Sequence, residues 1–256
     1  MSWDRNIVVK SQHELALMRE AGRVNALALA VVRDLVHPGV TTAELDAAAE
    51  EVIREHGGKP VFKGYPGPYP YPATLTISVN EELVHGIPGK RKLKEGDIVS
   101  IDCGTLLDGF VGDSAFSMGV GEISPEAQSL LDVTEQSLYQ GIAKIRAGNR
   151  VGDVSHAVQE YAESRGYFLT REYTGHGVGR EMHEGPQVPN YGTPGRGMVL
   201  RPGLTIALEP MVLVGTARTR VLPDEWTVVS ADGSLTAHFE HTVAVTEGDP
   251  LILTLP

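Results

Sequence analysis

An internal duplication limits the possible fold of this chain more than any other feature of its sequence. Residues 39–57 match residues 148–166 at the same spacing, and residues 93–102 match residues 200–209 at nearly the same spacing. One long duplication predicts two similar halves related by a pseudo-twofold axis, rather than an array of short repeats. Similarity by chance between two amphipathic helices remains an alternative. The matched pairs are Gly39 with Gly148, Glu44 with Asp153, Leu45 with Val154, Ala48 with Ala157, Glu51 with Glu160, Gly57 with Gly166, Gly96 with Gly203 and Asp102 with Glu209.

Each half is predicted to contain two helices followed by strands, which indicates an α+β fold. Capping boxes begin at Ser11 and Thr41, and a third helix begins after Ser124 with proline at its first position. The dipeptide at residues 108–109 is Asp-Gly, which predicts the turn of a β-hairpin. Strands are predicted at residues 74–79, 97–103, 204–208, 225–229 and 236–245.

Acidic residues at corresponding positions of the two halves indicate a shared site. Asp102 and Glu209 each follow an apolar run, so we expect both at the ends of buried strands near the pseudo-twofold axis. Carboxylates in a dry centre repel one another, so several can converge only around a cation. Asp102 and Asp113 could instead be solvated charges at the edge of a sheet. The candidate site residues are Asp102, Asp113, Glu209, Glu240, His85, His176 and His183.

Two other segments are candidates for the walls of a site. Residues 174–186 carry His176 and His183 with glycines around the first, although such histidines also occur in ordinary turns. Residues 64–72 form a loop rich in proline and tyrosine, which could be a rigid surface loop or the wall of a pocket.

Composition and charge exclude several classes of protein. The net charge of −11 argues against nucleic-acid binding. Cys103 is the only cysteine, so no disulfide is possible within the chain, and we expect it to be a small buried apolar residue. Residues 1–5 precede no apolar core, so we expect no signal peptide, and no apolar run is long enough to cross a membrane. We therefore expect a cytoplasmic protein without a membrane partner.

The sequence resembles the type I methionine aminopeptidases over almost its whole length, on the motifs at residues 78–88, 97–102, 108–113, 175–179, 182–184, 209–211 and 239–242. The resemblance implies the pita-bread fold: one catalytic domain over residues 1–256, with antiparallel sheets covered by helices. The two pseudo-twofold halves would span about residues 11–120 and 121–246.

The resemblance also implies a site with two divalent cations, which could be Co, Mn, Fe or Zn. Asp113 and Glu240 would bridge the ions, Asp102 would complete one, and His176 with Glu209 the other. A bridging water, activated by the metals, would attack the first peptide bond. His183 would stabilise the developing oxyanion, His85 would contact the substrate backbone, and Glu209 would carry the proton to the leaving amine. The ligands implied are Asp102, Asp113, His176, Glu209 and Glu240.

The implied reaction is removal of the initiator methionine from nascent chains when the next residue is small. Thr76 stands where many relatives have cysteine, His238 replaces a common glutamine, and the segment from Tyr65 to Tyr71 is longer than usual, which affects fine specificity rather than the reaction. We expect a monomer, while docking on ribosomes is left open by the sequence. The methionine pocket would be lined by Phe62, Tyr65, Tyr71, Thr76, Met182 and Trp226.

Three alternative interpretations fit the sequence less well. Prolidases and X-Pro aminopeptidases carry a large extra N-terminal domain, for which the sequence has no room before residue 11, and type II enzymes carry a helical insertion that the second half lacks. A non-catalytic relative that has lost its metals would not need all five ligand-competent residues.

Overall fold

A computed structural model describes residues 7–256, and the prediction about a signal peptide at residues 1–5 lies outside this range. Four helices and fifteen strands follow one another along the described chain. The helices are α1 (Gln12–Leu35), α2 (Thr42–Glu55), α3 (Pro125–Ile142) and α4 (Val151–Glu163). The strands are β1 (Lys59–Pro60), β2 (Leu75–Val79), β3 (Glu82–Val84), β4 (Ile98–Leu107), β5 (Phe110–Gly119), β6 (Phe168–Leu169), β7 (Gly175–Gly177), β8 (Glu184–Val188), β9 (Thr205–Leu208), β10 (Met211–Leu213), β11 (Thr219–Val221), β12 (Val228–Ser230), β13 (Thr236–His238), β14 (Glu240–Ala244) and β15 (Leu251–Ile252).

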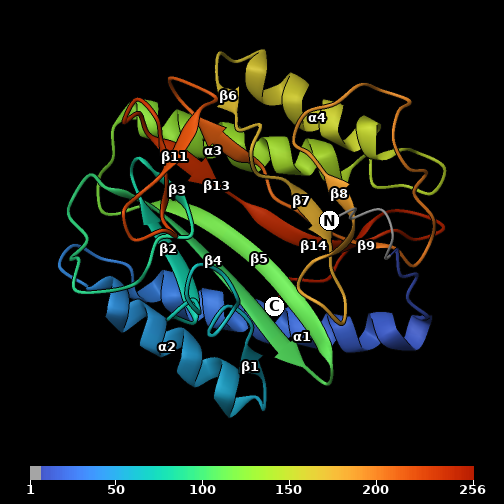
Figure 1. The fold of residues 1–256 in the computed structure, drawn as a ribbon, viewed down its shortest axis with the longest axis horizontal. Coiled ribbons are helices and arrows are strands. Elements are labelled where there is room, and N and C mark those ends of the chain that lie inside the picture. The colour runs from blue at the N-terminus through green and yellow to red at the C-terminus, as the bar shows by residue number, and fades with distance from the viewer. Residues whose placement is uncertain (1–6) are drawn as a thin grey trace.

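One antiparallel sheet crosses the middle of the molecule and joins the two halves (Figure 1). Its strand order is β1-β4-β5-β14-β9-β7-β8, with β2 paired to β4 and β15 paired to β14. The halves meet where β5 pairs with β14, with Ala115 opposite Glu240. The α+β class is thus confirmed, and strands of both halves form one continuous sheet, accompanied by two three-stranded sheets.

The helices pack in two pairs, with α1 and α2 at the bottom of the view in Figure 1 and α3 and α4 at the top. Both predicted capping boxes are confirmed, because Ser11 and Thr41 each accept from the backbone of a glutamate three residues later. Helix α1 lies close to β5, where a Cβ added at Gly112 would approach the Gly22 Cα to 2.6 Å. Within residues 7–256, no helix has the length and apolar character needed to cross a membrane.

The predicted duplication is confirmed by matching hydrogen bonds at the start of the second helix of each half. The Gly39 N–H donates to the Leu93 carbonyl at 2.7 Å, and the Gly148 N–H donates to the Leu200 carbonyl at 3.0 Å. Both glycines have positive φ, 98° and 89°, a conformation that other L-residues seldom adopt. The same backbone geometry therefore recurs at the paired positions of the two halves, as a duplication predicts.

The sequence predicted Asp102 at the end of its strand, but in the structure it lies in the middle of β4. Strand β4 continues to Leu107, and Asp102 pairs with Thr76 on one side and with Ala115 on the other. The strand continues because its hairpin turn lies at Asp108-Gly109, six residues further on. The expectation is right for Glu209, which directly follows β9.

The predicted strand over residues 236–245 is divided at Phe239. Its first part, β13, pairs with β10 in a small sheet, and its second part, β14, enters the central sheet. The predicted strand over residues 225–229 begins only at Val228, because Glu225 has a φ of 63° that a strand cannot contain.

Candidate metal centre and substrate cavity

Strand register places the predicted acidic residues on one face of the central sheet. Directly opposed residues in an antiparallel pair share a face, as do residues two apart along a strand. Ala115 lies opposite both Asp102 and Glu240, and Asp113 is two residues before it. These three carboxylates therefore project from the same side of the sheet.

The second half adds an imidazole and a further carboxylate to this face. Ala207 in β9 lies opposite both Thr242 in β14 and His176 in β7, which places His176 on the face that carries Glu240. Glu209 follows two residues after Ala207. Both halves thus contribute side chains to one site.

Three of these side chains are close enough to hold one cation. Asp113, His176 and Glu240 are buried, and each offers a ligand atom that lies within 4.8 Å of the others. The His176 Nε2 is 3.6 Å from Asp113 Oδ2 and 3.5 Å from Glu209 Oε1. Asp102 lies in the same cavity as this group. The Glu209 side chain is 14% exposed, so it remains accessible to water and to a substrate.

The buried carboxylates lack partners, within the described part of the chain, that would make a charge stable there. Asp102 Oδ1, Asp113 Oδ1 and Glu240 Oε1 are buried without a hydrogen-bond partner among residues 7–256. Burial raises the pKa of Asp113 to about 7. Burial, and then the charge of Asp113, raise the pKa values of Asp102, Glu209 and Glu240 well above their usual range. Unpartnered oxygens and one imidazole form a donor set that fits divalent transition-metal ions.

The imidazole at this centre stays neutral, as a metal ligand must. Burial, and then the nearby His183, lower the pKa of His176 to about 3. Its Nδ1 is 2.9 Å from the Gly177 carbonyl oxygen, so an Nδ1–H can donate there and leave Nε2 as the acceptor that faces the carboxylates.

Removing metal should make the stability of the protein fall as the pH rises above about 6.5. Carboxyls with a raised folded pKa hold protons that the unfolded chain has released, so each lowers the free energy of unfolding as pH rises toward that pKa. Histidines with lowered pKa values, such as His176, oppose this only below about 6.5, where the unfolded imidazole still binds a proton. The expected slope above that pH is about −1.4 kcal/mol per pH unit for each carboxyl still protonated.

Urea unfolding between pH 6.5 and 9, with chelator or with Mn²⁺, measures this dependence. The metal-loaded protein should not show the decline, because a cation replaces the protons and its binding strengthens as the ligands ionise. If the free energy of unfolding in the presence of chelator did not change with pH, these carboxyls would not be forced together in the folded protein.

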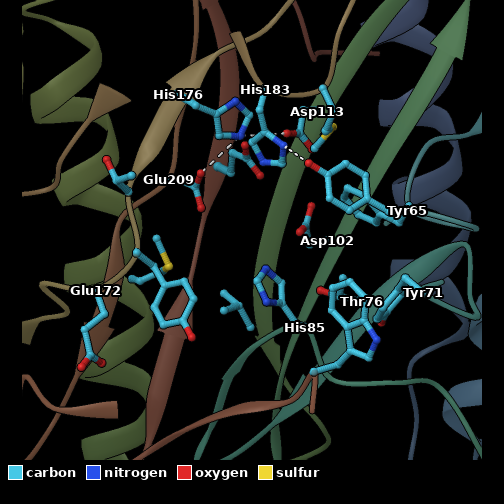
Figure 2. Close-up of a pocket in the computed structure, with 18 of the residues that line it drawn as sticks. Tyr65, Tyr71, Thr76, His85, Asp102, Asp113, Glu172, His176, His183 and Glu209 are labelled. Carbon is cyan, nitrogen blue, oxygen red and sulfur yellow. Dashed lines mark hydrogen bonds and ion pairs between the residues drawn. The ribbon is translucent and has the colours of Figure 1, made fainter. Parts of the chain in front are cut away.

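A cavity of roughly 320 Å³ contains the cluster, and its lining includes every one of the predicted site residues. Figure 2 shows His176, Asp113 and Glu209 gathered at one end and His85 at the other. The functions of these residues remain predictions, but their convergence is a property of the fold. The lining residues that sequence reasoning did not place in the site are Val84, Glu172, Tyr173, Gln187 and Met211.

Two further histidines face the cavity from opposite directions. His183 lies beside the cluster, with its ring centroid 4.3 Å from that of His176, and its Nδ1 is 2.6 Å from the Tyr65 hydroxyl. His85 follows β3 with a φ of 61°, a conformation that costs free energy in a non-glycine residue and is concentrated at functional sites. Burial lowers the pKa of both His85 and His183 to about 4, so both are neutral hydrogen-bonding groups near pH 7.

Aromatic side chains from the loop at residues 64–72 form the apolar wall of the cavity. The Tyr71 hydroxyl shares its one hydrogen between the carbonyl oxygens of Leu75 and Gly86, at 3.1 and 2.9 Å. Its ring packs edge-to-face on Trp226, with the ring centroids 5.1 Å apart. Gly67 lies directly against the Trp226 ring, because a Cβ there would approach it to 2.4 Å. These contacts support the interpretation of the loop as a pocket wall rather than a free surface loop.

A buried ion pair holds the segment that carries His183, and no local pattern of residues predicts it. The Lys10 Nζ is 2.5 Å from Glu184 Oε2, with the two side chains only 2% and 5% exposed. The other oxygen of Glu184 accepts from the Arg180 backbone N–H at 2.8 Å. Lys10 thereby connects the segment before α1 to the turn between β7 and β8.

Replacing Lys10 with methionine should lower the free energy of unfolding by about 3–5 kcal/mol, because Glu184 would be left as a buried unpaired charge. The matched control is Arg146→Met, which breaks an exposed ion pair with Asp249 and should cost less than about 1 kcal/mol. Urea denaturation of both variants measures the difference. Equal losses would show that the Lys10 pair contributes no more than a surface contact.

Comparisons with known proteins agree with this site. Residues 16–247 match the profile of Metallopeptidase family M24. The chain is 50% identical over 249 residues to methionine aminopeptidase of Clostridium perfringens, covering 97% of this chain and 99% of that one. The crystal structure of methionine aminopeptidase from Thermotoga maritima superposes with a TM-score of 0.95 at 48% identity, covering 98% of this chain and 100% of that chain.

Prolidase from Pyrococcus furiosus shares only the fold. It is 20% identical, with a TM-score of 0.79, and the match covers 97% of this chain but 66% of that chain. About a third of the prolidase therefore has no counterpart in the match. The chain therefore belongs to Metallopeptidase family M24 and, within it, to the methionine aminopeptidases, whose pita-bread fold it shares.

Proposed function

We propose that this chain is a metal-dependent aminopeptidase that removes an N-terminal methionine when the next residue is small. The observation that carries the proposal is one cavity in which a buried, cation-competent cluster adjoins an aromatic-walled apolar slot. Relatives of near-identical length bear the name methionine aminopeptidase. At roughly 320 Å³ the cavity is near the lower limit for ligand pockets, which favours a small residue after the methionine.

In this proposal Asp102, Asp113, His176, Glu209 and Glu240 hold two divalent cations. When bound, the cations anchor the substrate's free α-amine, polarise the scissile carbonyl and lower the pKa of a coordinated water. Burial favours the metal-loaded state, because the cations neutralise carboxylates that otherwise repel one another. The identity of the metal is left among Co, Mn, Fe and Zn.

The remaining chemistry belongs to side chains of the cavity. Glu209 accepts a proton from the attacking water and gives it to the leaving amine. Its raised pKa and partial exposure suit a group that must both take up and release a proton. His183 donates to the oxyanion that develops at the scissile carbonyl, with its ring oriented by Tyr65. His85 hydrogen-bonds the substrate backbone from the other end of the cavity.

The side chain of the substrate methionine would occupy the slot formed by Phe62, Tyr65, Tyr71, Met182 and Trp226. Thr76 lines the same cavity. Thioethers make favourable contacts with aromatic edges, and this slot presents several. Tyr71 is held by two carbonyl groups and by Trp226, so the slot is formed before substrate binds.

We further propose that the chain forms a single catalytic domain with halves at about residues 11–120 and 121–246. The matched hydrogen bonds of the two halves and the shared cavity support this division. We also propose that it acts as a monomer in the cytoplasm on nascent chains. The lone, buried cysteine supports a reducing compartment.

Peptide hydrolysis with Mn²⁺ or Co²⁺ tests the function. The protein should release methionine from Met-Ala-Ser but not from Met-Leu-Ser, where the second residue is large, nor from acetyl-Met-Ala-Ser, where the amine is blocked. An Ala-Pro dipeptide tests the prolidase alternative. Cleavage of the blocked peptide, or of Ala-Pro in preference to Met-Ala-Ser, would contradict the proposal.

A further inference from the structure

The two carboxylate oxygens of Glu209 face different histidines. Oε1 is 3.5 Å from Nε2 of His176, within the proposed metal centre. Oε2 is 3.6 Å from Nε2 of His238, which is not among the residues that line the cavity. The proposed function assigns no part to His238.

His238 is a buried side chain whose position is fixed by its backbone. Its backbone N–H donates to Ser117 Oγ at 2.9 Å, and the Ser117 hydroxyl donates to its carbonyl at 2.7 Å. In β13 it lies opposite Met211, two residues after Glu209. These contacts fix the backbone position from which the buried ring approaches the carboxylate.

The ring nitrogen that faces Glu209 has no other hydrogen-bond partner in the described structure. His238 is 2% exposed, and its Nε2 is buried and unpaired. Unpaired buried polar groups are costly, and a gap of 3.6 Å is only slightly longer than a hydrogen bond. Nε2 and Oε2 need to approach by about 0.4 Å to come within the usual range of an N–H···O hydrogen bond.

We propose that His238 is a positioning residue for Glu209: its neutral imidazole donates Nε2–H to Oε2 and keeps Oε1 directed at the metal centre. The inference rests on the proposed function of Glu209. A neutral imidazole donates from one nitrogen only, so the Nε2–H tautomer is required.

Two substitutions separate this hydrogen bond from simple packing. His238→Leu keeps the bulk of the side chain and removes the donor, whereas His238→Gln supplies an amide N–H. We expect His238→Leu to lower kcat for Met-Ala-Ser by about 10- to 100-fold, with KM unchanged within about twofold, and to weaken Mn²⁺ binding by about 10-fold. His238→Gln should restore both to within about threefold of the wild type.

His241→Leu is the matched control. His241 is also largely buried, but its Nδ1 is 2.9 Å from the Thr254 hydroxyl oxygen, and it follows Glu240 and so lies on the opposite face of β14. This variant should lose stability while its kcat and Mn²⁺ affinity stay near the wild-type values.

Calorimetric Mn²⁺ titration of the four proteins is independent of whether the peptide is cleaved. If the wild type releases no methionine, the proposed function fails, yet a weaker Mn²⁺ affinity in His238→Leu alone would still support the positioning role. Wild-type kcat and affinity in His238→Leu, or equal losses in the leucine and glutamine variants, would overturn it. Nitrogen-15 NMR of the histidines in Zn²⁺-loaded wild type adds a test free of mutation, since an Nδ1–H tautomer at His238 would also overturn the inference.

Discussion

Replacing Glu209 with glutamine should lower kcat for Met-Ala-Ser by roughly 10³-fold while KM changes little. Glutamine keeps the size of the side chain but cannot take a proton from water and deliver it to the leaving amine. Glutamine is also neutral, and its NH2 group does not coordinate a cation, so Mn²⁺ binding should weaken as well. The side chain is 14% exposed at the edge of the buried cluster, so the variant should fold normally.

Steady-state kinetics at saturating Mn²⁺ separates the two effects of this substitution. Excess metal should restore occupancy but not kcat. The same change at Glu55, an exposed residue at the end of α2, should leave the kinetics unaltered. Turnover by Glu209→Gln at the wild-type rate would remove Glu209 from the proton transfer.

Replacing Asp113 with asparagine should abolish activity and weaken Mn²⁺ binding at least about 100-fold, yet make the metal-free protein more stable. Asp113 is 1% exposed, and its charge raises the pKa values of Asp102, Glu209 and Glu240. Asparagine has nearly the same shape and no charge, so it relieves this repulsion. At pH 8 with chelator, we expect the free energy of unfolding to rise by on the order of 2 kcal/mol.

Asp113→Asn is thus expected to weaken metal binding and yet stabilise the metal-free protein, and the control variant is Asp46→Asn. Asp46 is also partly buried, but its Oδ1 accepts the backbone N–H groups of Thr74 and Leu75 at 2.9 and 2.8 Å. These contacts do not involve the metal centre, so this substitution should change stability equally with and without metal. If Asp113→Asn behaved in the same way, the cluster would be held by ordinary hydrogen bonds rather than by cations.

Much of the fold was predictable because its signals are local. Capping boxes, the Asp108-Gly109 turn and the repeated glycines each depend on a few neighbouring residues, and the structure places them as expected. The convergence of the acidic residues was predictable because a duplication implies a symmetric centre. The continuation of β4 past Asp102 was missed, because the length of β4 depends on its pairing with β2 and β5. A run of residues with high β-propensity does not show how far that pairing extends.

Other features depend on contacts between distant residues and have no local signal. The division at Phe239 follows from pairing with β10 in one sheet and with β9 in another. Lys10 and Glu184 are 174 residues apart in sequence. A lysine before a helix normally lies in solvent, so only the tertiary structure shows that this one is buried.

The most direct test of the proposed centre is a crystal structure of the protein loaded with Mn²⁺, with anomalous scattering recorded to locate the ions. We expect two anomalous peaks in the cavity, surrounded by Asp102, Asp113, His176, Glu209 and Glu240, with the now unpaired oxygens Asp113 Oδ1 and Glu240 Oε1 among the ligands. Protein saturated with Mn²⁺ that shows no peak among these side chains, or peaks only elsewhere, would contradict a cation-held site and the hydrolysis derived from it.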